Sequence, residues 1–596
     1  MRIKFILIAF CLFWLLLLVR IYYISIKSNT YYDEIAKQNA IKVEELAPSR
    51  GSILDINGKP LSVNKLGFSI GIAPQLSSSR NKKILDKEID FLADNLPNLD
   101  RKKLKKTYIK RDSPYSHEYV KVIDFITYDD VIKQFSKISQ RENLEIKAAS
   151  KRYYPYKDLA SHVIGYVAKA NLKDVQEDEV AKLVGYIGRT GIEKYYNGVL
   201  QGQKGEKRTK VTAFNEEIEE LDKRLPTSND LRLSLDLELQ QYISELFAGQ
   251  SGAIIVMNVK NGKVLAAGSF PEYDLNQFVS GISHEEWTKL ANDFNHPFTN
   301  KLINGLYPPG SIIKMGVGIA FMESNILTPY TNYYCTGSFE LGGRNFRCWK
   351  HDGHGTVNLN RAIRESCDDY FYKGSLRVGI DMISPVLEQL GFAQKTNVDL
   401  PYEFVGSVPS RTWKMQKYQK SWYQGETLIT SIGQGYFLVT PMQVARHTAL
   451  LATGYGVTPH FVDSVDGLEI DYGQDETVFN EVQKRYLPTI RKAMYEVVNH
   501  PNGTGHRYIN TKVKIAGKTG TAQVVGIPQG EKERMKESEL EYFKRSHAWF
   551  TSYGPYKDPQ YVVTVMVEHG GHGGAAAGSV VSKIYDKLLE KGYIKQ

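Results

Sequence analysis

The first twenty-six residues constrain the fold of this chain most strongly. Residues 5–19 form an unbroken apolar run, which reaches roughly the thickness of a bilayer if Arg20 snorkels and residues 21–26 are included. A cleavable signal peptide has an apolar core of similar length, but no A-x-A-like site follows the run, and Phe10 before Cys11 is too bulky for a lipoprotein cleavage site. We therefore predict an uncleaved transmembrane anchor at residues 1–26, with the bulk of the chain outside the cytoplasm.

The remainder of the 596 residues is too long for one core, so we expect two further domains. A polar, turn-rich stretch at residues 223–230 marks the boundary between residues 27–230 and residues 231–596. In the second domain a hairpin turned at Asn261-Gly262 comes early, helical patterns follow, and three strand patterns return near the C-terminus. This order predicts an α+β fold with an antiparallel sheet, built from both ends of the domain and flanked by helices.

The formal charge of +10 and the basic run at residues 101–111 resemble a nucleic-acid-binding pattern. However, a chain that is exported and tethered to a membrane rarely meets nucleic acid. A solvated helix face, or a contact with anionic lipid or wall polymer, explains the run better. We therefore predict no nucleic-acid partner.

The segment 307–315, with the sequence YPPGSIIKM, contains the strongest candidate for chemistry. If a helix begins after Pro-Pro-Gly, Ser311 and Lys314 lie one turn apart on the same face. The S-x-x-K spacing occurs three times in the chain, but only here do apolar residues surround the lysine. Burial disfavours a charged lysine, so Lys314 could be neutral near physiological pH and accept the serine proton. The start of the helix would also direct free N–H groups toward an oxyanion.

Two more short motifs complete a pattern. Ser366-Cys367-Asp368 lies downstream of the lysine, and Lys518-Thr519-Gly520-Thr521 lies on a predicted strand near the C-terminus. S-x-x-K, an S-x-N-like motif and K-T-G, in this order within one domain, are characteristic of penicillin-binding proteins and serine β-lactamases. Three matches in the right order make coincidence improbable.

With these motifs, the chain resembles a class B penicillin-binding protein over nearly its whole length. Residues 422–436 and 567–578 are most similar to the elongation type, penicillin-binding protein 2. The resemblance implies an elongated, mixed pedestal domain of the dimerisation type at residues 27–230 and a serine transpeptidase/β-lactamase-like domain at residues 231–596. The other stretches similar to the family's motifs are residues 50–61, 185–205, 432–445 and 518–523.

The resemblance also assigns roles to residues of the three motifs. Ser311 is expected to be the acylated nucleophile, Lys314 its base, and Ser366 a relay of the proton to the leaving group. Lys518 would hold a positive potential over the site. Thr519, Gly520 and Thr521 would bind the terminal carboxylate of the substrate, and the N–H groups of Ser311 and Thr521 would form the oxyanion hole.

Asp368 departs from the general pattern, in which an asparagine follows the serine by two residues. An ionised carboxylate only accepts hydrogen bonds, whereas an amide also donates them. Contact between Asp368 and Lys314 would favour the ammonium and work against the base role of Lys314. The elongation type resembles this chain in often having an aspartate here.

Three of the four cysteines and one histidine have a spacing that permits a metal site. The spacing C-x12-C-x5-H-x12-C connects Cys335, Cys348, His354 and Cys367, and three thiolates with one imidazole suit tetrahedral zinc. Such a metal would hold the loop that carries Ser366. Two alternatives stay open, a Cys335–Cys348 disulfide with a free Cys367 or three unbridged thiols, and His351 or Asp352 could replace His354 as a ligand.

The expected function follows from the resemblance. The chain would be a periplasmic peptidoglycan D,D-transpeptidase that cross-links D-Ala-D-Ala stem peptides through an acyl-enzyme on Ser311 during cell elongation and rod-shape maintenance, and β-lactams would trap the same serine. No cofactor is required for catalysis. The resemblance implies a single-pass inner-membrane location and a SEDS-family glycan polymerase with the elongation complex as partners.

One alternative function shares the acyl-enzyme chemistry, and a second belongs to another class. A serine β-lactamase or D,D-carboxypeptidase uses water to resolve the acyl-enzyme, but the anchor and roughly 200 residues ahead of the catalytic domain are superfluous for such a hydrolase. A non-catalytic penicillin sensor would need several membrane spans and a cytoplasmic output domain, which the sequence does not indicate. The transpeptidase is therefore the predicted function.

Overall fold

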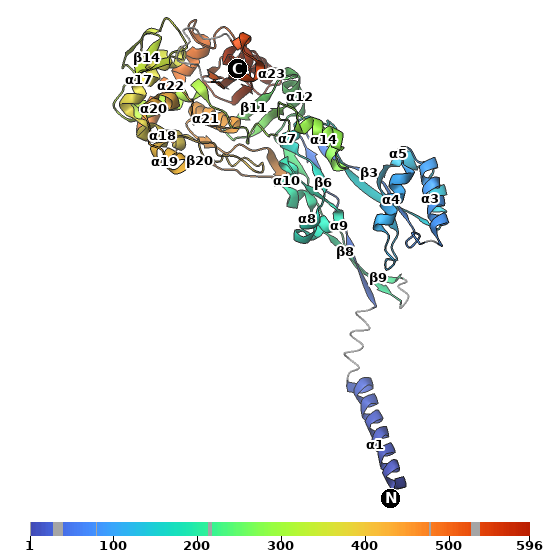
Figure 1. Cartoon of the computed structure of the whole chain (residues 1–596). Helices are drawn as coiled ribbons and strands as arrows, with labels where there is room; N and C mark the ends of the chain where they lie inside the picture. Colours follow the sequence, from blue (N-terminus) through green and yellow to red (C-terminus); the bar gives the residue numbers. More distant parts are fainter. Residues whose placement is uncertain are drawn as a thin grey trace. The chain divides into compact units, whose positions relative to one another are not determined.

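The computed structural model describes residues 2–27, 40–78, 80–212, 217–475, 478–525 and 537–595 (Figure 1). The chain divides into two compact units. One contains Met1–Arg50, Ala170–Tyr186 and Gln201–Asn229, and the other contains Gly51–Lys169, Ile187–Leu200 and Asp230–Gln596. One boundary between the two units falls between residues 229 and 230. Residues 51–169, however, group with the C-terminal part. The division into three domains stays a prediction.

The first unit begins with α1 (Arg2–Tyr22), which continues as a π-helical turn over Tyr23–Lys27. The helix over residues 3–27 contains an 18-residue stretch with a mean hydropathy of 2.6, and within the described part of the chain it is the one helix long and apolar enough to cross a membrane. The unit also contains an antiparallel sheet of three strands, in the order β1 (Ile41–Leu46), β8 (Gly205–Val211) and β9 (Glu217–Arg224).

In the second unit, a seven-stranded sheet joins strands that are distant in the sequence. β2 (Ile53–Leu54) pairs antiparallel with β3 (Pro60–Ile72) and parallel with β10 (Leu231–Leu233). This parallel pairing explains why residues 51–169 group with the C-terminal part. The remaining strands are β4 (Val120–Thr127) and β5 (Leu144–Tyr153) beside β3, and β18 (Val462–Val465) and β19 (Leu468–Glu469) beyond β10.

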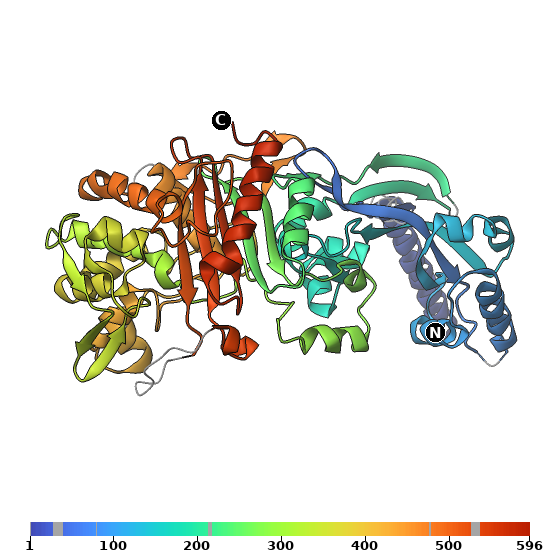
Figure 2. The same cartoon turned by 90° about the horizontal axis from the view of Figure 1, so that it is seen from above.

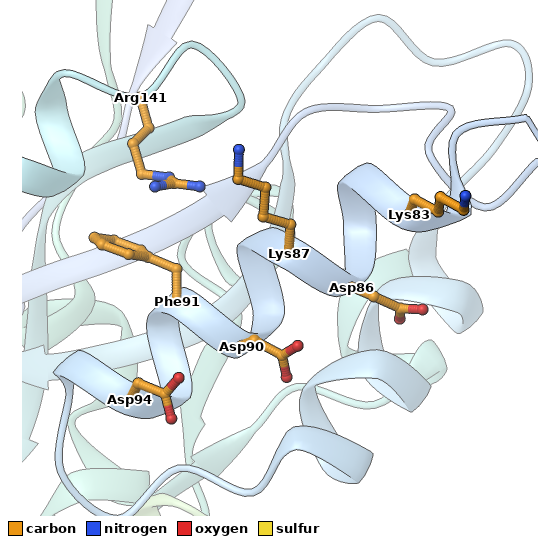
Figure 3. A pocket seen from close by; sticks show the side chains of 7 residues that line it. All are labelled: Lys83, Asp86, Lys87, Asp90, Phe91, Asp94 and Arg141. Atoms are coloured by element: carbon orange, nitrogen blue, oxygen red, sulfur yellow. The ribbon is translucent and has the colours of Figure 1, made fainter.

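The basic run at residues 101–111 forms α4 (Arg101–Arg111), which contacts α3 (Lys82–Asn95). Figure 3 shows the aspartates of α3 on one side of the helix, whereas Lys87 and Phe91 point toward Arg141 across an open pocket. The neighbouring segments thus partly neutralise the charge of α4. The ion pairs are Arg101 with Asp90 at 3.0 Å and with Asp94, Lys105 with Asp86, and Arg111 with Asp124 at 3.1 Å.

A five-stranded antiparallel sheet forms the centre of the C-terminal part, as predicted (Figure 2). Its two strands from the start of this part form the hairpin turned at Asn261-Gly262, and its three other strands come from the end, so the sheet is assembled from both ends. The order is β12 (Val264–Phe270), β11 (Gly252–Asn258), β23 (Tyr561–Val567), β22 (His547–Gly554) and β21 (Ala516–Ala522).

Helices cover this sheet. Every residue of β12 and β23 is buried, which requires cover on both faces because side chains alternate between the faces of a strand. β21 is an edge strand, and on its free side it contacts the turn Gly310–Ile313. The longer helices that contact the sheet are α12 (Leu237–Leu246), α21 (Pro441–Thr453), α22 (Glu481–Asn499) and α23 (Gly573–Glu590). The α+β fold expected from the sequence is confirmed.

Candidate active site

A helical segment begins after Pro308 and Pro309, as predicted. A 3-10 turn covers Gly310–Ile313, and α15 (Lys314–Glu323) follows directly. Gly310 has a φ of 57°, and a Cβ atom at this position would lie 2.8 Å from the carbonyl oxygen of Thr521. Only glycine therefore allows the turn to approach the edge strand so closely. The half-exposed Ser311 is presented at this edge of the sheet.

Lys314 is completely buried, as expected, but its amine is not in apolar surroundings. Its Nζ donates to the carbonyl oxygen of Ser366 at 2.9 Å, to Ser366 Oγ at 3.3 Å and to Asp368 Oδ1 at 2.7 Å. Among the residues that the structure describes, Ser311 Oγ makes no hydrogen bond to Lys314 Nζ. Lys314 and Asp368 thus form an ion pair inside the protein, with 2.7 Å between Nζ and Oδ1.

The hydroxyl of Ser366 lies between two buried lysines. Lys518 Nζ donates to Ser366 Oγ at 3.0 Å, and Lys314 Nζ donates to the same oxygen at 3.3 Å. Ser366 has a φ of 55°, in the left-handed region that serine rarely adopts, and it directly precedes Cys367 at the start of α17 (Asp368–Val378). This turn directs both the carbonyl oxygen and the hydroxyl of one residue at Lys314.

Burial and neighbouring charges shift the pKa values of Lys518 and Asp368. Burial and the nearby Lys314 ammonium hold the pKa of Lys518 well below its usual range. Burial raises the pKa of Asp368, while Lys314 opposes that shift. A Lys314–Asp368 ion pair with a neutral Lys518 amine has no net charge, whereas a protonated Lys518 would add an uncompensated buried cation. The geometry thus favours a neutral Lys518 rather than the positive potential that the family resemblance implies.

The Lys-Thr-Gly motif lies on β21, next to the turn that carries Ser311. A Cβ atom on Gly520 would lie 2.9 Å from Ile312 Cγ2, so glycine is needed for the strand to pack against the turn. Thr519 Oγ1 lies 2.7 Å from Thr504 Oγ1, and Thr521 Oγ1 accepts a bond from Gly573 N at 3.4 Å. All eight predicted catalytic and substrate-binding residues are therefore located around the junction between this strand, the turn and the start of α17.

Other side chains fix the turn, and the sequence reasoning did not identify them. The indole of Trp549 donates to the carbonyl oxygen of Pro308 at 3.2 Å, and the hydroxyl of Tyr307 donates to Glu568 Oε1 at 2.6 Å. Glu568 belongs to the stretch 567–578, whose resemblance to the family was the available signal. Neither its spacing nor its residue type indicates that it contacts the segment ahead of Ser311.

The four predicted metal ligands come together in the structure. Their ligand atoms all lie within 4.8 Å of one another, and all four residues are buried. Cys335 ends β13 (Tyr333–Cys335), Cys348 follows β15 (Arg344–Arg347), His354 precedes β16 (Gly355–Val357), and Cys367 precedes α17. The four cysteines of the chain are all described, and none forms a disulfide.

Known proteins resemble this chain over nearly its full length. The family model for the penicillin-binding protein transpeptidase domain matches residues 252–590, and the model for the penicillin-binding protein dimerisation domain matches residues 45–233. The peptidoglycan D,D-transpeptidase MrdA of Haemophilus influenzae is 35% identical over 590 residues, which cover 96% of this chain and 89% of the relative.

Solved structures agree with this match. The complex between penicillin-binding protein 2 (PBP2) and MreC from Helicobacter pylori has a TM-score of 0.86 at 43% identity, covering 93% of this chain and 99% of that chain. A peptidoglycan synthase complex that coordinates polymerization and crosslinking contains a chain with a TM-score of 0.71 at 26% identity, covering 100% of this chain and 99% of that chain. The chain therefore belongs to the penicillin-binding protein transpeptidase family.

Proposed function

We propose that the chain is a serine-type peptidoglycan D,D-transpeptidase that forms its acyl-enzyme on Ser311 and acts in cell elongation. The observation that carries this proposal is the position of the Ser366 hydroxyl between Lys314 and Lys518, next to the turn of Ser311. The relatives named MrdA are peptidoglycan D,D-transpeptidases, and they align with this chain nearly end to end.

The reaction is acyl transfer in two steps. Ser311 Oγ attacks the carbonyl carbon of the penultimate D-alanine, and the terminal D-alanine leaves. An amine of a neighbouring stem peptide then attacks the ester, forms the cross-link and frees the serine. The N–H groups of Ser311 and Thr521 hold the oxyanion in both steps, and one such donor contributes about 3 to 4 kcal/mol. Thr519, Gly520 and Thr521 bind the terminal carboxylate of the donor peptide.

The buried lysines supply a route for the proton. As the cation of its ion pair with Asp368, Lys314 must first release a proton before it accepts one from Ser311. The hydroxyl of Ser366 contacts both amines and passes this proton to Lys518, whose lowered pKa leaves it neutral and able to accept. The reverse route delivers a proton to the nitrogen of the leaving D-alanine.

Benzylpenicillin tests this proposal on the full chain in detergent. We expect one covalent adduct that stays for hours and maps to the peptide containing Ser311, together with cross-linking of glycan-linked stem peptides. Rapid loss of the adduct would indicate a hydrolase, and a stable adduct without cross-linking would indicate a penicillin sensor. The absence of an adduct would contradict all three functions.

We further propose that α1 anchors the chain in a bacterial inner membrane, with the catalytic part in the periplasm. The length and apolar composition of α1 support the anchor. PBP2 of Helicobacter pylori was solved with MreC, and the synthase complex couples polymerization to crosslinking. These relatives support a place in an elongation complex. From the motif resemblance we propose a SEDS-family glycan polymerase as the partner and residues 27–230 as its docking pedestal.

We also propose that Cys335, Cys348, His354 and Cys367 hold a structural zinc ion. Tetrahedral zinc with bonds of about 2.3 Å to sulfur and about 2.0 Å to nitrogen places neighbouring sulfur and nitrogen ligands about 3.5 Å apart. His354 Nδ1 lies 3.6 Å from Cys335 Sγ and 3.5 Å from Cys348 Sγ. The ion would fix Cys367, and with it Ser366 and Asp368, but it would take no part in the acyl transfer.

Removal of the metal is expected to reduce acylation by about tenfold or more, because the loop of Ser366 loses its support. The measurement is zinc per chain by elemental analysis, with the benzylpenicillin acylation rate, before and after mild chelation. Cys367→Ser should lose zinc, whereas Cys11→Ser in α1 should retain one zinc per chain. A metal-free chain with the full acylation rate would rule out this structural role.

A further inference from the structure

Three aromatic rings form a partly exposed cluster beside the active site, which we call the aromatic shelf. Trp413 and Tyr418 belong to α19 (Arg411–Tyr418), and Tyr436 lies on the loop ahead of α21. The ring centroids of Trp413 and Tyr436 are 5.5 Å apart, those of Tyr418 and Tyr436 are 5.2 Å apart, and those of Trp413 and Tyr418 are 5.6 Å apart. Each ring therefore contacts the other two.

The shelf is not part of the hydrophobic core. Tyr418 is 41% exposed and Tyr436 is 38% exposed, whereas the adjacent Phe437 is completely buried. Lys417 Nζ lies 5.1 Å from the ring centroid of Trp413 and 5.7 Å from that of Tyr418. Within the described residues, the two hydroxyls, the indole N–H and this ammonium form no hydrogen bond or ion pair. Four polar groups thus border the rings and are free to bind a ligand.

Hydrogen bonds connect the loop that carries Tyr436 to the catalytic centre. On the loop of Tyr436, the Gly433 carbonyl oxygen accepts a bond from Gly310 N at 2.8 Å, and Gln434 Nε2 donates to the Thr521 carbonyl oxygen at 3.3 Å. Ser407 Oγ donates to the Tyr436 carbonyl oxygen at 2.7 Å. The loop that presents Tyr436 therefore contacts both the turn of Ser311 and the Lys-Thr-Gly strand.

Helix α19 is also fixed in place. The side chain of Lys414 is buried, and its Nζ donates to the Ser421 carbonyl oxygen at 2.8 Å and pairs with Glu426. On the same helix Lys417 and Tyr418 are exposed and Trp413 is partly exposed. The position of the rings is thus set before any ligand binds, which lowers the entropic cost of binding.

We propose that the aromatic shelf binds an amino-sugar ring of the glycan strand whose stem peptide occupies the active site. This inference rests on the proposed function. A pyranose ring has flat C–H faces that pack on aromatic rings, and hydroxyl and acetamido groups at its edge that pair with Tyr hydroxyls, the Trp N–H and a lysine. A buried protein interface would instead leave these polar groups unpaired unless the partner matched each of them.

A sugar subsite would also serve the reaction. The stem peptide and its sugar are covalently joined, so binding of the sugar raises the effective concentration of the peptide at Ser311. Binding energy from a part of the substrate that does not react can also hold the reacting carbonyl in place. The shelf would thereby select polymeric glycan over free peptide as the substrate.

Direct binding to the full chain in detergent is the first test. The probe is a peptide-free oligomer of N-acetylglucosamine and N-acetylmuramic acid, and saturation-transfer NMR titration gives its dissociation constant. We expect Tyr436→Ala and Trp413→Ala to weaken binding by about tenfold. Met415→Ala on the same helix and Tyr330→Ala at another exposed tyrosine should bind like the wild type. Equal sugar binding by all variants would overturn the proposal and leave the shelf to a protein partner.

Substrate selectivity is the second test. Cross-linking rates are measured with glycan-linked stem peptides and with free stem peptides of the same sequence. The rates are divided by the concentration of active chains, which penicillin labelling of a separate sample gives. We expect the glycan-to-free ratio of kcat/KM to fall by about tenfold in Tyr436→Ala and Trp413→Ala, through KM. An equal loss for both substrates would overturn the proposal. A wild type that cross-links neither substrate would refute the proposed function, while the NMR titration would still decide the sugar site.

Discussion

The Ser311→Ala chain is expected to form no covalent adduct with benzylpenicillin, even under conditions in which the wild type is fully labelled. Alanine removes the only atom of residue 311 that can form the ester, and the remaining groups can stabilise an oxyanion but cannot replace that bond. Among the described residues, Ser311 Oγ has no hydrogen-bond partner, so the substitution should change the free energy of unfolding by less than about 0.5 kcal/mol. Intact-protein mass measurement after incubation reads out the adduct.

Ser324→Ala provides the matched control for this prediction. Ser324 follows the same helix, α15, and its hydroxyl donates to the carbonyl oxygen of Phe321 at 2.7 Å. This variant loses a serine hydroxyl at the other end of the helix, and benzylpenicillin should label it at the wild-type rate. A Ser311→Ala chain that still carries one penicillin, on any other residue, would show that the nucleophile has been assigned wrongly.

The architecture around the central sheet could be predicted because it depends on local patterns. The turn at Asn261-Gly262 and the three strand patterns near the C-terminus identify β11, β12, β21, β22 and β23, and their order in the chain indicates a sheet built from both ends. The grouping of residues 51–169 with the C-terminal part could not be predicted. It depends on the parallel pairing of β2 with β10, and residues that pair across more than 170 positions leave no local signal.

Short sequence motifs predict which residues form the candidate site, but they do not predict the balance of charges within it. The sequence identifies Lys314, Asp368 and Lys518 individually, and it raises the question of whether Asp368 contacts Lys314. Only the three-dimensional structure shows that the two lysines share the hydroxyl of Ser366. The pKa of a buried amine depends on the charges within a few ångströms, and residues 150 or more positions away supply those charges here.

The cysteine and histidine positions illustrate another limit of sequence reasoning. Their spacing allowed zinc, a disulfide or free thiols, and the structure brings all four side chains together with unpaired cysteines. The aromatic shelf is the opposite case, because aromatic residues in a sequence of this composition are usually core residues. The exposure of Tyr418 and Tyr436 became evident only from the fold.

Replacement of Lys518 by arginine is expected to slow acylation by about 10²- to 10⁴-fold, the usual range for loss of a general acid–base group. A guanidinium stays protonated and cannot accept the proton that Ser366 carries away from Lys314. If Lys518 acted only as a positive charge over the site, arginine would preserve most of the rate. Lys492 is an exposed lysine of α22, and Lys492→Arg controls for the replacement of a lysine by an arginine. This variant should have the wild-type acylation rate.

The pH dependence of acylation separates the same two roles of Lys518. Burial and the Lys314 ammonium lower the pKa of Lys518, so its neutral form accumulates as the pH rises through that lowered value. If the neutral amine accepts the proton, the acylation rate rises with pH through this range, and the Lys518→Arg chain lacks this rise. If the ammonium is required, the rate falls instead, because deprotonation removes the charge. Stopped-flow acylation by benzylpenicillin between about pH 5 and 9 distinguishes these slopes, and a falling wild-type rate would exclude the proton route through Ser366.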